Sequence, residues 1–190
     1  MSVNKSLPLT TAEEAAAYRA SGIWPDETVY EMFERAALRD PGKLAIVDAN
    51  RRYTYRELLD AVNALAQGFL DAGIGTGDVV ATQLPNGAEQ PMTHLALNRI
   101  GALAMPVHES WRDAELPHLL STSRAVAAVV FTDYRGFDFP KLYGSLRDTL
   151  PDLKQVFSVG GASAHAKPFE ALLAASPDMA ALNARRPHPD

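Results

Sequence analysis

The chain has 190 residues, of which 47% are hydrophobic and 22% are charged. This is the balance of a folded globular domain rather than of a disordered or membrane-spanning chain. The formal net charge is −5 and no basic stripe is present, which argues against binding to a nucleic-acid backbone. The absence of cysteine excludes a disulfide framework, a thiolate nucleophile and a cysteine-based zinc site.

No run approaches the roughly 20 apolar residues of a spanning helix, and the first ten residues carry no apolar signal core. We therefore expect a cytoplasmic protein with neither nucleic acid nor a membrane as a partner.

The first third of the chain contains three capping boxes, in which a threonine is followed three residues later by a glutamate. The first predicts a short leading helix, and the second an amphipathic helix that Pro41-Gly42 stops. The third opens a long amphipathic helix that ends at Gly73, where a helix favours a left-handed residue. Two short runs between the second and third boxes predict a hairpin. The three boxes begin at Thr11, Thr28 and Thr54, and the hairpin strands are Leu44–Val47 and Arg52–Thr54.

Four apolar runs of strand length follow at near-regular intervals, with a helical pattern between neighbouring runs. Nearly all-apolar strands joined by helices predict a parallel sheet that is covered on both faces. The predicted fold class is therefore α/β, with a doubly wound, mostly parallel sheet and helices on both faces. The expected strands are Val79–Leu84, Ala102–Val107, Val126–Phe131 and Val156–Val159, and the expected helices are Ala88–Ile100, Asp113–Ser121 and Phe139–Leu150.

Two prolines restrict where these helices begin. Pro91 and Pro117 fit only if each helix starts just before its proline, because a later proline removes a backbone hydrogen bond and costs about 3 kcal/mol. Asn86, after the first apolar strand, is a candidate helix cap. We divide the chain into a lead-in with a short helix over residues 1–27, an α/β lobe over 28–160, and a short helix with a truncated linker over 161–190.

Two glycine-rich stretches resemble phosphate loops. A dinucleotide fingerprint follows a strand and opens a helix, whereas the stretch from Gly73 to Gly77 closes a helix and leads into a strand. This order favours a helix cap followed by a turn. The stretch Gly160-Gly161-Ala162-Ser163, with Lys167, follows a strand but lacks the Walker spacing, which favours a surface loop. No serine has the context of a hydrolase nucleophile. No metal spacing links the five histidines, which are His94, His108, His118, His165 and His188.

Seven short stretches stand out between Thr28 and Phe139, and each has a structural explanation as a cap, turn or strand. They are Thr28–Ala37, Arg52–Leu58, Gly73-Ile74 with Gly77–Ala81, Gln83–Asn86, Arg99–Ala102, Trp111–Leu116 and Arg135–Phe139. Their order resembles the N-terminal region of the adenylate-forming (AMP-binding) superfamily. The resemblance covers Thr28 to Gly160. It is strongest to acyl-CoA synthetases and aryl-acid–AMP ligases similar to cyclohexanecarboxylate–CoA ligase and dihydroxybenzoate–AMP ligase.

The resemblance implies the first lobe of the N-terminal domain of an acyl-CoA synthetase. Such enzymes form an acyl-adenylate from a carboxylic acid and ATP with the help of Mg, and then transfer the acyl group to CoA. The family's phosphate loop, Thr-Glu pair, ribose-binding aspartate and C-terminal lysine have no counterpart in these 190 residues. The resemblance therefore implies no catalytic residue and no metal ligand in this segment, and no cofactor bound by the segment alone. It assigns Arg135 to the CoA phosphates, while the residues alone favour a solvated loop arginine.

The sequence leaves three hypotheses for the function. The chain is either the inactive N-terminal fragment of an acid–CoA ligase of fatty-acid metabolism, a non-catalytic interaction module, or one half of a split ligase. In the first and third cases its partner is the remainder of the ligase or a complementing chain. We also expect the isolated segment to self-associate through sheet edges or through apolar surface that a second lobe would cover.

Overall fold

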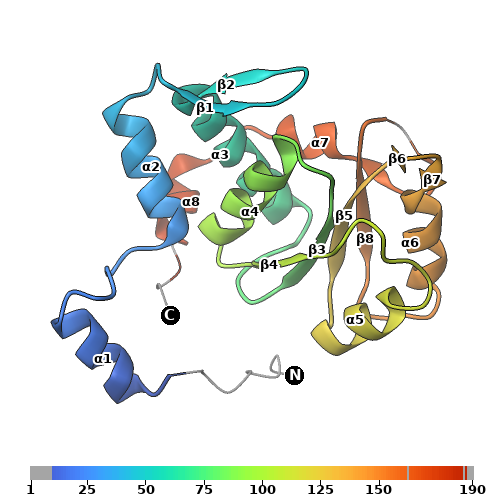
Figure 1. Cartoon of the computed structure of the whole chain (residues 1–190), viewed down its shortest axis with the longest axis horizontal. Helices are drawn as coiled ribbons and strands as arrows, with labels where there is room; N and C mark the ends of the chain where they lie inside the picture. Colours follow the sequence, from blue (N-terminus) through green and yellow to red (C-terminus); the bar gives the residue numbers. More distant parts are fainter. Residues whose placement is uncertain (1–9, 162, 186, 188–190) are drawn as a thin grey trace.

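The computed structural model describes residues 10–161, 163–185 and 187, and Figure 1 shows their arrangement. Within these residues the centre is a five-stranded parallel sheet in the order β4-β3-β5-β8-β9. The strands are β3 (Val79–Gln83), β4 (Leu103–Pro106), β5 (Ala127–Phe131), β8 (Gln155–Val159) and β9 (Lys167–Pro168).

Alternate residues of the central strands point into two separate hydrophobic cores. Val80 and Val129 belong to the core on one face, whereas Ala81 and Val130 belong to the core on the other. The first core is covered by α3 (Tyr55–Asp71), α4 (Glu89–Arg99) and α7 (Phe169–Leu173), and the second by α5 (Leu116–Ser123) and α6 (Phe139–Arg147). Helices on both faces of a parallel sheet confirm the predicted doubly wound α/β class.

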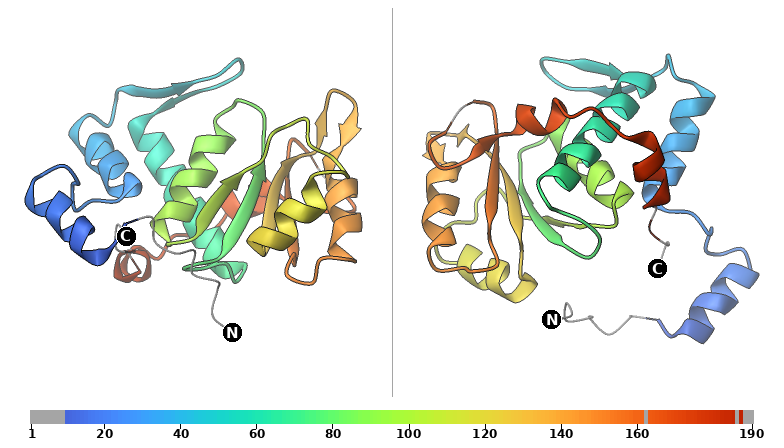
Figure 2. Two further views of the ribbon diagram at one scale, coloured as in Figure 1. Left: turned by 60° about the horizontal axis from the view of Figure 1, so that its bottom comes forward. Right: turned by 180° about the vertical axis from the view of Figure 1, so that it is seen from behind.

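The N-terminal elements lie outside the sheet. They are α1 (Ala12–Ala20), α2 (Val29–Arg39) and the antiparallel hairpin of β1 (Leu44–Val47) and β2 (Arg52–Thr54). All three predicted capping boxes are present, at Thr11, Thr28 and Thr54, with each threonine hydroxyl accepting from the glutamate N–H and each glutamate bonding back to the threonine N–H. Helix α1 lies beyond α2, away from the sheet (Figures 1 and 2).

The last part of the described chain returns to the first core. Seen from behind, α7 and α8 (Met179–Ala184) run across α3 (Figure 2). Leu172 and Leu182 are buried in the same core as α3 and α4. The buried Arg99 guanidinium joins three helices, because its Nη2 donates to Asn183 Oδ1 of α8 at 3.1 Å and its Cζ lies 4.3 Å from the centroid of the Tyr30 ring of α2.

The prolines lie in the first turns of their helices, as the sequence predicts. Pro91 is the third residue of α4 and Pro117 the second of α5. The start predicted for α5 at Asp113 is wrong by three residues, because residues 113–115 form a turn before Leu116. The predicted cap at Asn86 is also wrong, since Ala88 is the N-cap of α4 and no side chain caps that helix. The structure adds a short hairpin, β6 (Asp133–Tyr134) and β7 (Phe137–Asp138), that the sequence did not predict.

Candidate functional site

The strand order locates a crevice at the carboxyl ends of β3 and β5. The chain leaves β3 for α4 on one face and leaves β5 for α6 on the other, so the two connections diverge. Such a divergence is where open α/β sheets bind ligands. A cavity of about 130 Å³ lies there, lined by Leu84–Gly87 after β3 and by Phe131 at the end of β5.

The tip of the β1–β2 hairpin closes one side of this cavity. Asp48, Asn50 and Arg51 line it, together with Glu89 from the first turn of α4. The Asp48 carboxylate accepts from the backbone N–H of Asn50 at 2.8 Å and of Arg51 at 2.7 Å. The bond from Asn50 is the main cause of a lowered Asp48 pKa. The Arg51 guanidinium in turn pairs with Glu89, so the hairpin is fixed to α4.

Next to the cavity, the last residue of β3 organises the loop that follows β4. The buried Tyr143 hydroxyl of α6 donates to Gln83 Oε1 at 3.0 Å. Gln83 Nε2 donates to the carbonyls of His108 at 2.7 Å and Trp111 at 3.1 Å. Burial raises the pKa of Tyr143, which keeps its hydroxyl protonated as a donor. Gln83 therefore holds the loop from His108 to Trp111 against the end of the sheet.

The β6–β7 hairpin packs against this loop and carries Arg135. The Arg112 guanidinium lies 4.1 Å from the ring centroid of Phe137 and 4.5 Å from that of Phe139, and it donates to the carbonyls of Glu109 and Trp111. The Tyr134 hydroxyl donates to Glu109 at 3.2 Å. The loop from His108 to Arg112 and this hairpin therefore form one unit, which we call the carboxyl-edge rim.

Arg135 lies at the tip of the rim. It has a φ of 57° in the turn between β6 and β7, and its guanidinium lies 5.0 Å from the centroid of the Tyr134 ring. The side chain is exposed and has no ion pair with a carboxylate among the described residues. Its position is compatible with an arginine that receives an anion from outside, and the assignment to CoA stays a prediction.

Sequence reasoning missed the residues that organise the rim. Gln83 and Tyr143 are 60 positions apart, and although Gln83 and Arg112 lie in stretches that carry the family resemblance, no local pattern gave either of them a role. One signal was available, because Gln83 and Thr82 are polar residues at the end of a strand that begins with three apolar residues. A buried polar side chain requires partners, and in this position its partners are loops at the carboxyl edge.

The glycine-rich stretches take the structural roles that the sequence favours. Gly73, with a φ of 82°, terminates α3, and the N–H of Ile74 reaches back to the carbonyl of Phe69 at 2.9 Å. This is the helix-ending pattern of a left-handed cap rather than a phosphate loop. Lys167 lies in β9 and donates to Gln155 at 2.8 Å, while Ala162 lies outside the described residues. No group of histidine, aspartate and glutamate side chains suited to a metal ion occurs in the described part of the chain.

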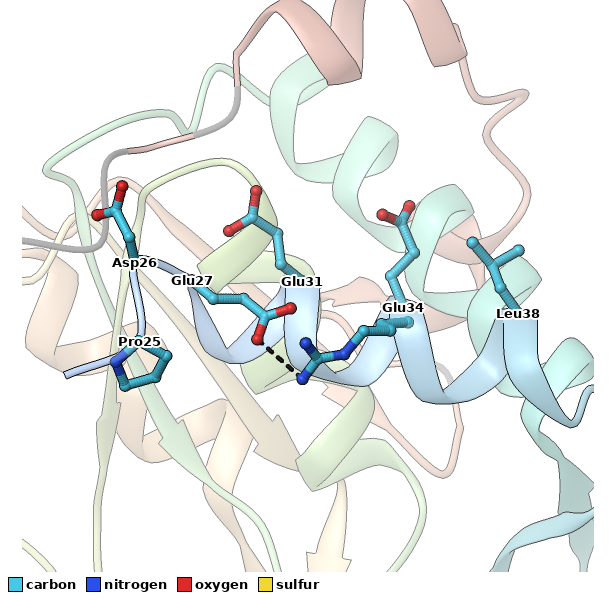
Figure 3. Close-up of a pocket in the computed structure, with 7 residues that line it drawn as sticks. Pro25, Asp26, Glu27, Glu31, Glu34 and Leu38 are labelled. Atoms are coloured by element: carbon cyan, nitrogen blue, oxygen red, sulfur yellow. Dashed lines mark ion pairs between the residues drawn. The ribbon is translucent and has the colours of Figure 1, made fainter. Parts of the chain in front are cut away.

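An acidic groove of about 590 Å³ follows the exposed side of α2 (Figure 3). Its carboxylates serve the structure of the helix and its neighbours. Glu27 pairs with Arg35 at 2.9 Å, Glu31 belongs to the capping box of Thr28, and Glu34 accepts from the Tyr30 hydroxyl at 2.9 Å. The groove is therefore a poor site for a phosphate-bearing ligand, which requires positive charge.

Comparison with known proteins shows to which family the chain belongs. The family model described as "AMP-binding enzyme" matches residues 33–188. The medium-chain fatty-acid–CoA ligase of Escherichia coli K12 is 37% identical over 161 residues, and the 2,3-dihydroxybenzoate-AMP ligase of Bacillus subtilis is 33% identical over 177 residues. These matches cover 82% and 90% of this chain but only 28% and 33% of the relatives.

A solved structure agrees with the sequence matches. The apo structure of Mycobacterium smegmatis MbtA has a TM-score of 0.78 and 36% identity, and the likeness covers 88% of this chain and 31% of MbtA. The chain thus spans about a third or less of the length of the relatives named here. No helix of the described residues is long and apolar enough to cross a membrane. The family model, the relatives and the α/β lobe agree, and the chain belongs to the AMP-binding enzyme family of AMP-forming acid ligases.

Proposed function

We propose that this chain is the N-terminal part of an AMP-forming acid–CoA ligase, an acyl-CoA synthetase that activates a carboxylic acid with ATP through an acyl-adenylate. The observation that carries the proposal is the family match over residues 33–188. The relatives include a fatty-acid–CoA ligase and aryl-acid–AMP ligases, so the substrate class is a fatty or aromatic carboxylic acid.

The described residues contribute a scaffold to this reaction. Stabilising the α-phosphate of ATP while the adenylyl group moves to the carboxylate and pyrophosphate leaves requires aligned donors and cations. The crevice between β3 and β5 offers Arg51, but that guanidinium is already paired with Glu89. We infer that the remainder of the ligase, or a complementing chain, supplies the groups that bind ATP and Mg, while the carboxyl-edge rim presents Arg135 to CoA.

The test is carboxylate-dependent ATP–pyrophosphate exchange with two preparations. One is the 190-residue chain, and the other is the product of the complete gene. We expect exchange only with the complete product, and we expect it with medium-chain fatty acids or with hydroxybenzoates. An in-frame Ser/Thr/Gly-rich loop ending in lysine, downstream of Asp190, is the matching sequence observation.

Two outcomes would contradict the proposal. Exchange by the pure 190-residue chain, at a rate typical of intact ligases, would show that the segment is catalytic by itself. A complete product without exchange on any acid of the panel would favour the non-catalytic interaction module. Exchange that appears only after a second polypeptide is added would assign the chain to a split ligase.

A further inference from the structure

The outer side of α6 carries a second groove, of about 670 Å³, that the proposed ligase function does not use. Its walls come from three segments: α6 itself, the connection from α6 to β8, and the loop between β8 and β9. The opposite side of α6 packs on the sheet through Leu142, Tyr143 and Leu146. The helix therefore separates this groove from the sheet, and we call it the α6 groove.

Positive charge dominates the α6 groove, although the chain as a whole has a net charge of −5. Lys141, Arg147 and Lys154 line it, and Asp148 is the carboxylate among the lining residues. None of the three cations has an ion pair with a carboxylate of the described residues. The carboxylate nearest to Lys154 in sequence, Asp152, is bound by Arg124 at 3.1 Å, and Lys154 interacts with it only at longer range.

A glycine allows the third wall to approach the helix. A Cβ built on Gly144 would lie 3.0 Å from His165 Cβ and 3.2 Å from His165 Nδ1. A side chain at this position would therefore require the His165 side chain to shift by a few tenths of an ångström. The backbone N–H of His165 also donates to Ser163 Oγ at 3.1 Å, which fixes the turn that carries the imidazole. The groove thus adds an imidazole from the loop to the ammonium and guanidinium groups of the other two segments.

We propose that the α6 groove binds a small phosphate-bearing molecule. Ammonium, guanidinium and imidazole groups are the side chains that recognise phosphate oxygens. The volume falls within the range of small-molecule sites and exceeds what a single phosphate needs. A diphosphate, alone or as part of a nucleotide, offers several charged oxygens to cations that come from separate segments. The proposal does not depend on the ligase function, because its residues lie outside the crevice and the rim.

The experiment follows backbone amide resonances of the 190-residue chain during titration with inorganic pyrophosphate at constant ionic strength. We expect saturable shifts confined to residues 141–148, 153–154 and 163–165. Lys154→Gln is expected to weaken the apparent affinity roughly twofold to fivefold, because it removes one exposed charge pair with the ligand. Lys43→Gln is the matched control, since it deletes the same charge at an exposed site outside the groove and should leave the affinity unchanged.

A parallel titration with ADP identifies the source of the phosphate. Tighter binding of ADP than of pyrophosphate supports a nucleotide ligand, and equal binding supports an inorganic diphosphate. The spectra also report whether each variant is folded, so a loss of binding is not confused with unfolding. Shifts that never saturate, or equal weakening by Lys43→Gln and Lys154→Gln, would show nonspecific ion accumulation and overturn the proposal.

Discussion

The family resemblance assigns Arg135 to the CoA phosphates, and the structure places it at the exposed tip of a hairpin. The turn between β6 and β7 holds it in a left-handed conformation, with a φ of 57°, which is uncommon for a residue other than glycine, asparagine or aspartate. The neighbouring Gly136, with a φ of 77°, completes the turn, and its N–H donates to Asp133 Oδ1 at 3.1 Å. The guanidinium is therefore presented to solvent by a short, internally bonded hairpin.

We predict that Arg135→Ala weakens CoA binding in the complete ligase and leaves adenylate formation intact. The free-energy cost of the left-handed conformation is similar for alanine and arginine. The substitution therefore mainly removes the guanidinium and its phosphate contacts. Separate assays of pyrophosphate exchange and of thioester formation measure the two half-reactions. Arg39→Ala, at an exposed site on α2, is the control. Equal losses in both half-reactions would indicate a folding defect and contradict the prediction.

His94 makes the stability of the fold depend on pH in a defined window. Its Nε2 lies 2.9 Å from Thr82 Oγ1, and burial lowers its pKa below the ordinary value of 6.5. Between that value and the lower folded-state pKa, the unfolded chain binds a proton that the folded chain does not. The free energy of unfolding therefore falls as the pH decreases through this window.

We predict that His94→Gln flattens the dependence of stability on pH just below 6.5. The carboxylates whose pKa values are lowered, such as Asp48 and Glu57, start from ordinary values of 3.8 and 4.5 and contribute at lower pH. Urea unfolding at a series of pH values measures the slope for both proteins. Identical slopes in the wild type and the variant would show that another group titrates in this window.

At the scale of elements, local signals predicted some boundaries well and others poorly. Capping boxes and helix-ending glycines act through bonds between residues a few positions apart, so their spacing alone indicates the helix. The two-residue strands β6, β7 and β9 exist because of their partners. Helix α8 has a local cap at Asp178, but its position against α4 involves the contact between Arg99 and Asn183, which are 84 positions apart. No local pattern carries such information.

At the contact between α3 and α7, helix propensity alone predicts the wrong sign for the change in stability caused by a glycine-to-alanine substitution. Glycine to alanine within a helix normally stabilises it by about 1 kcal/mol. A Cβ on Gly68 would, however, lie 2.3 Å from the Leu172 carbonyl oxygen, so α3 and α7 must move apart. We predict that Gly68→Ala lowers the free energy of unfolding by about 1–3 kcal/mol. Denaturant unfolding measures it, and Gly75→Ala, whose Cβ meets nothing within 4 Å, serves as the control.

The link between α6 and the loop from His108 to Trp111 is also testable. Tyr143→Phe removes the donor to Gln83 Oε1 and leaves that buried oxygen without its partner, at a cost of about 1–3 kcal/mol. We predict faster hydrogen exchange at residues 108–112 in the variant than in the wild type. Tyr55→Phe is the matched control, because Tyr55 is partly buried and its hydroxyl makes no hydrogen bond to another described residue. Unchanged exchange in the loop would show that Gln83 holds it without Tyr143.

At the scale of the whole molecule, the sequence predicted the class of the sheet but not the location of its crevice. Apolar runs indicate parallel strands, but nothing in them specifies that β5 lies beside β3 rather than beside β4. The crevice is a consequence of that order, because it exists where neighbouring connections diverge. The residues of the candidate site could therefore be assembled only after the topology was known, with Arg135 as the exception that family resemblance supplied.

The edge strand β4 leads to the last prediction, which is self-association of the 190-residue chain. Among the described strands β4 pairs only with β3, and Leu103 of β4 is 55% exposed. An unpaired edge with an exposed apolar side chain is a template for a second copy. We predict that the weight-average mass from light scattering rises with concentration, and that Leu103→Lys reduces this rise because a charge on the edge opposes pairing. Leu38→Lys, at a side chain 68% exposed on α2, is the control that changes the charge equally away from the sheet. A monomer at every concentration would contradict the prediction, whereas disruption by Leu38→Lys alone would place the contact on α2.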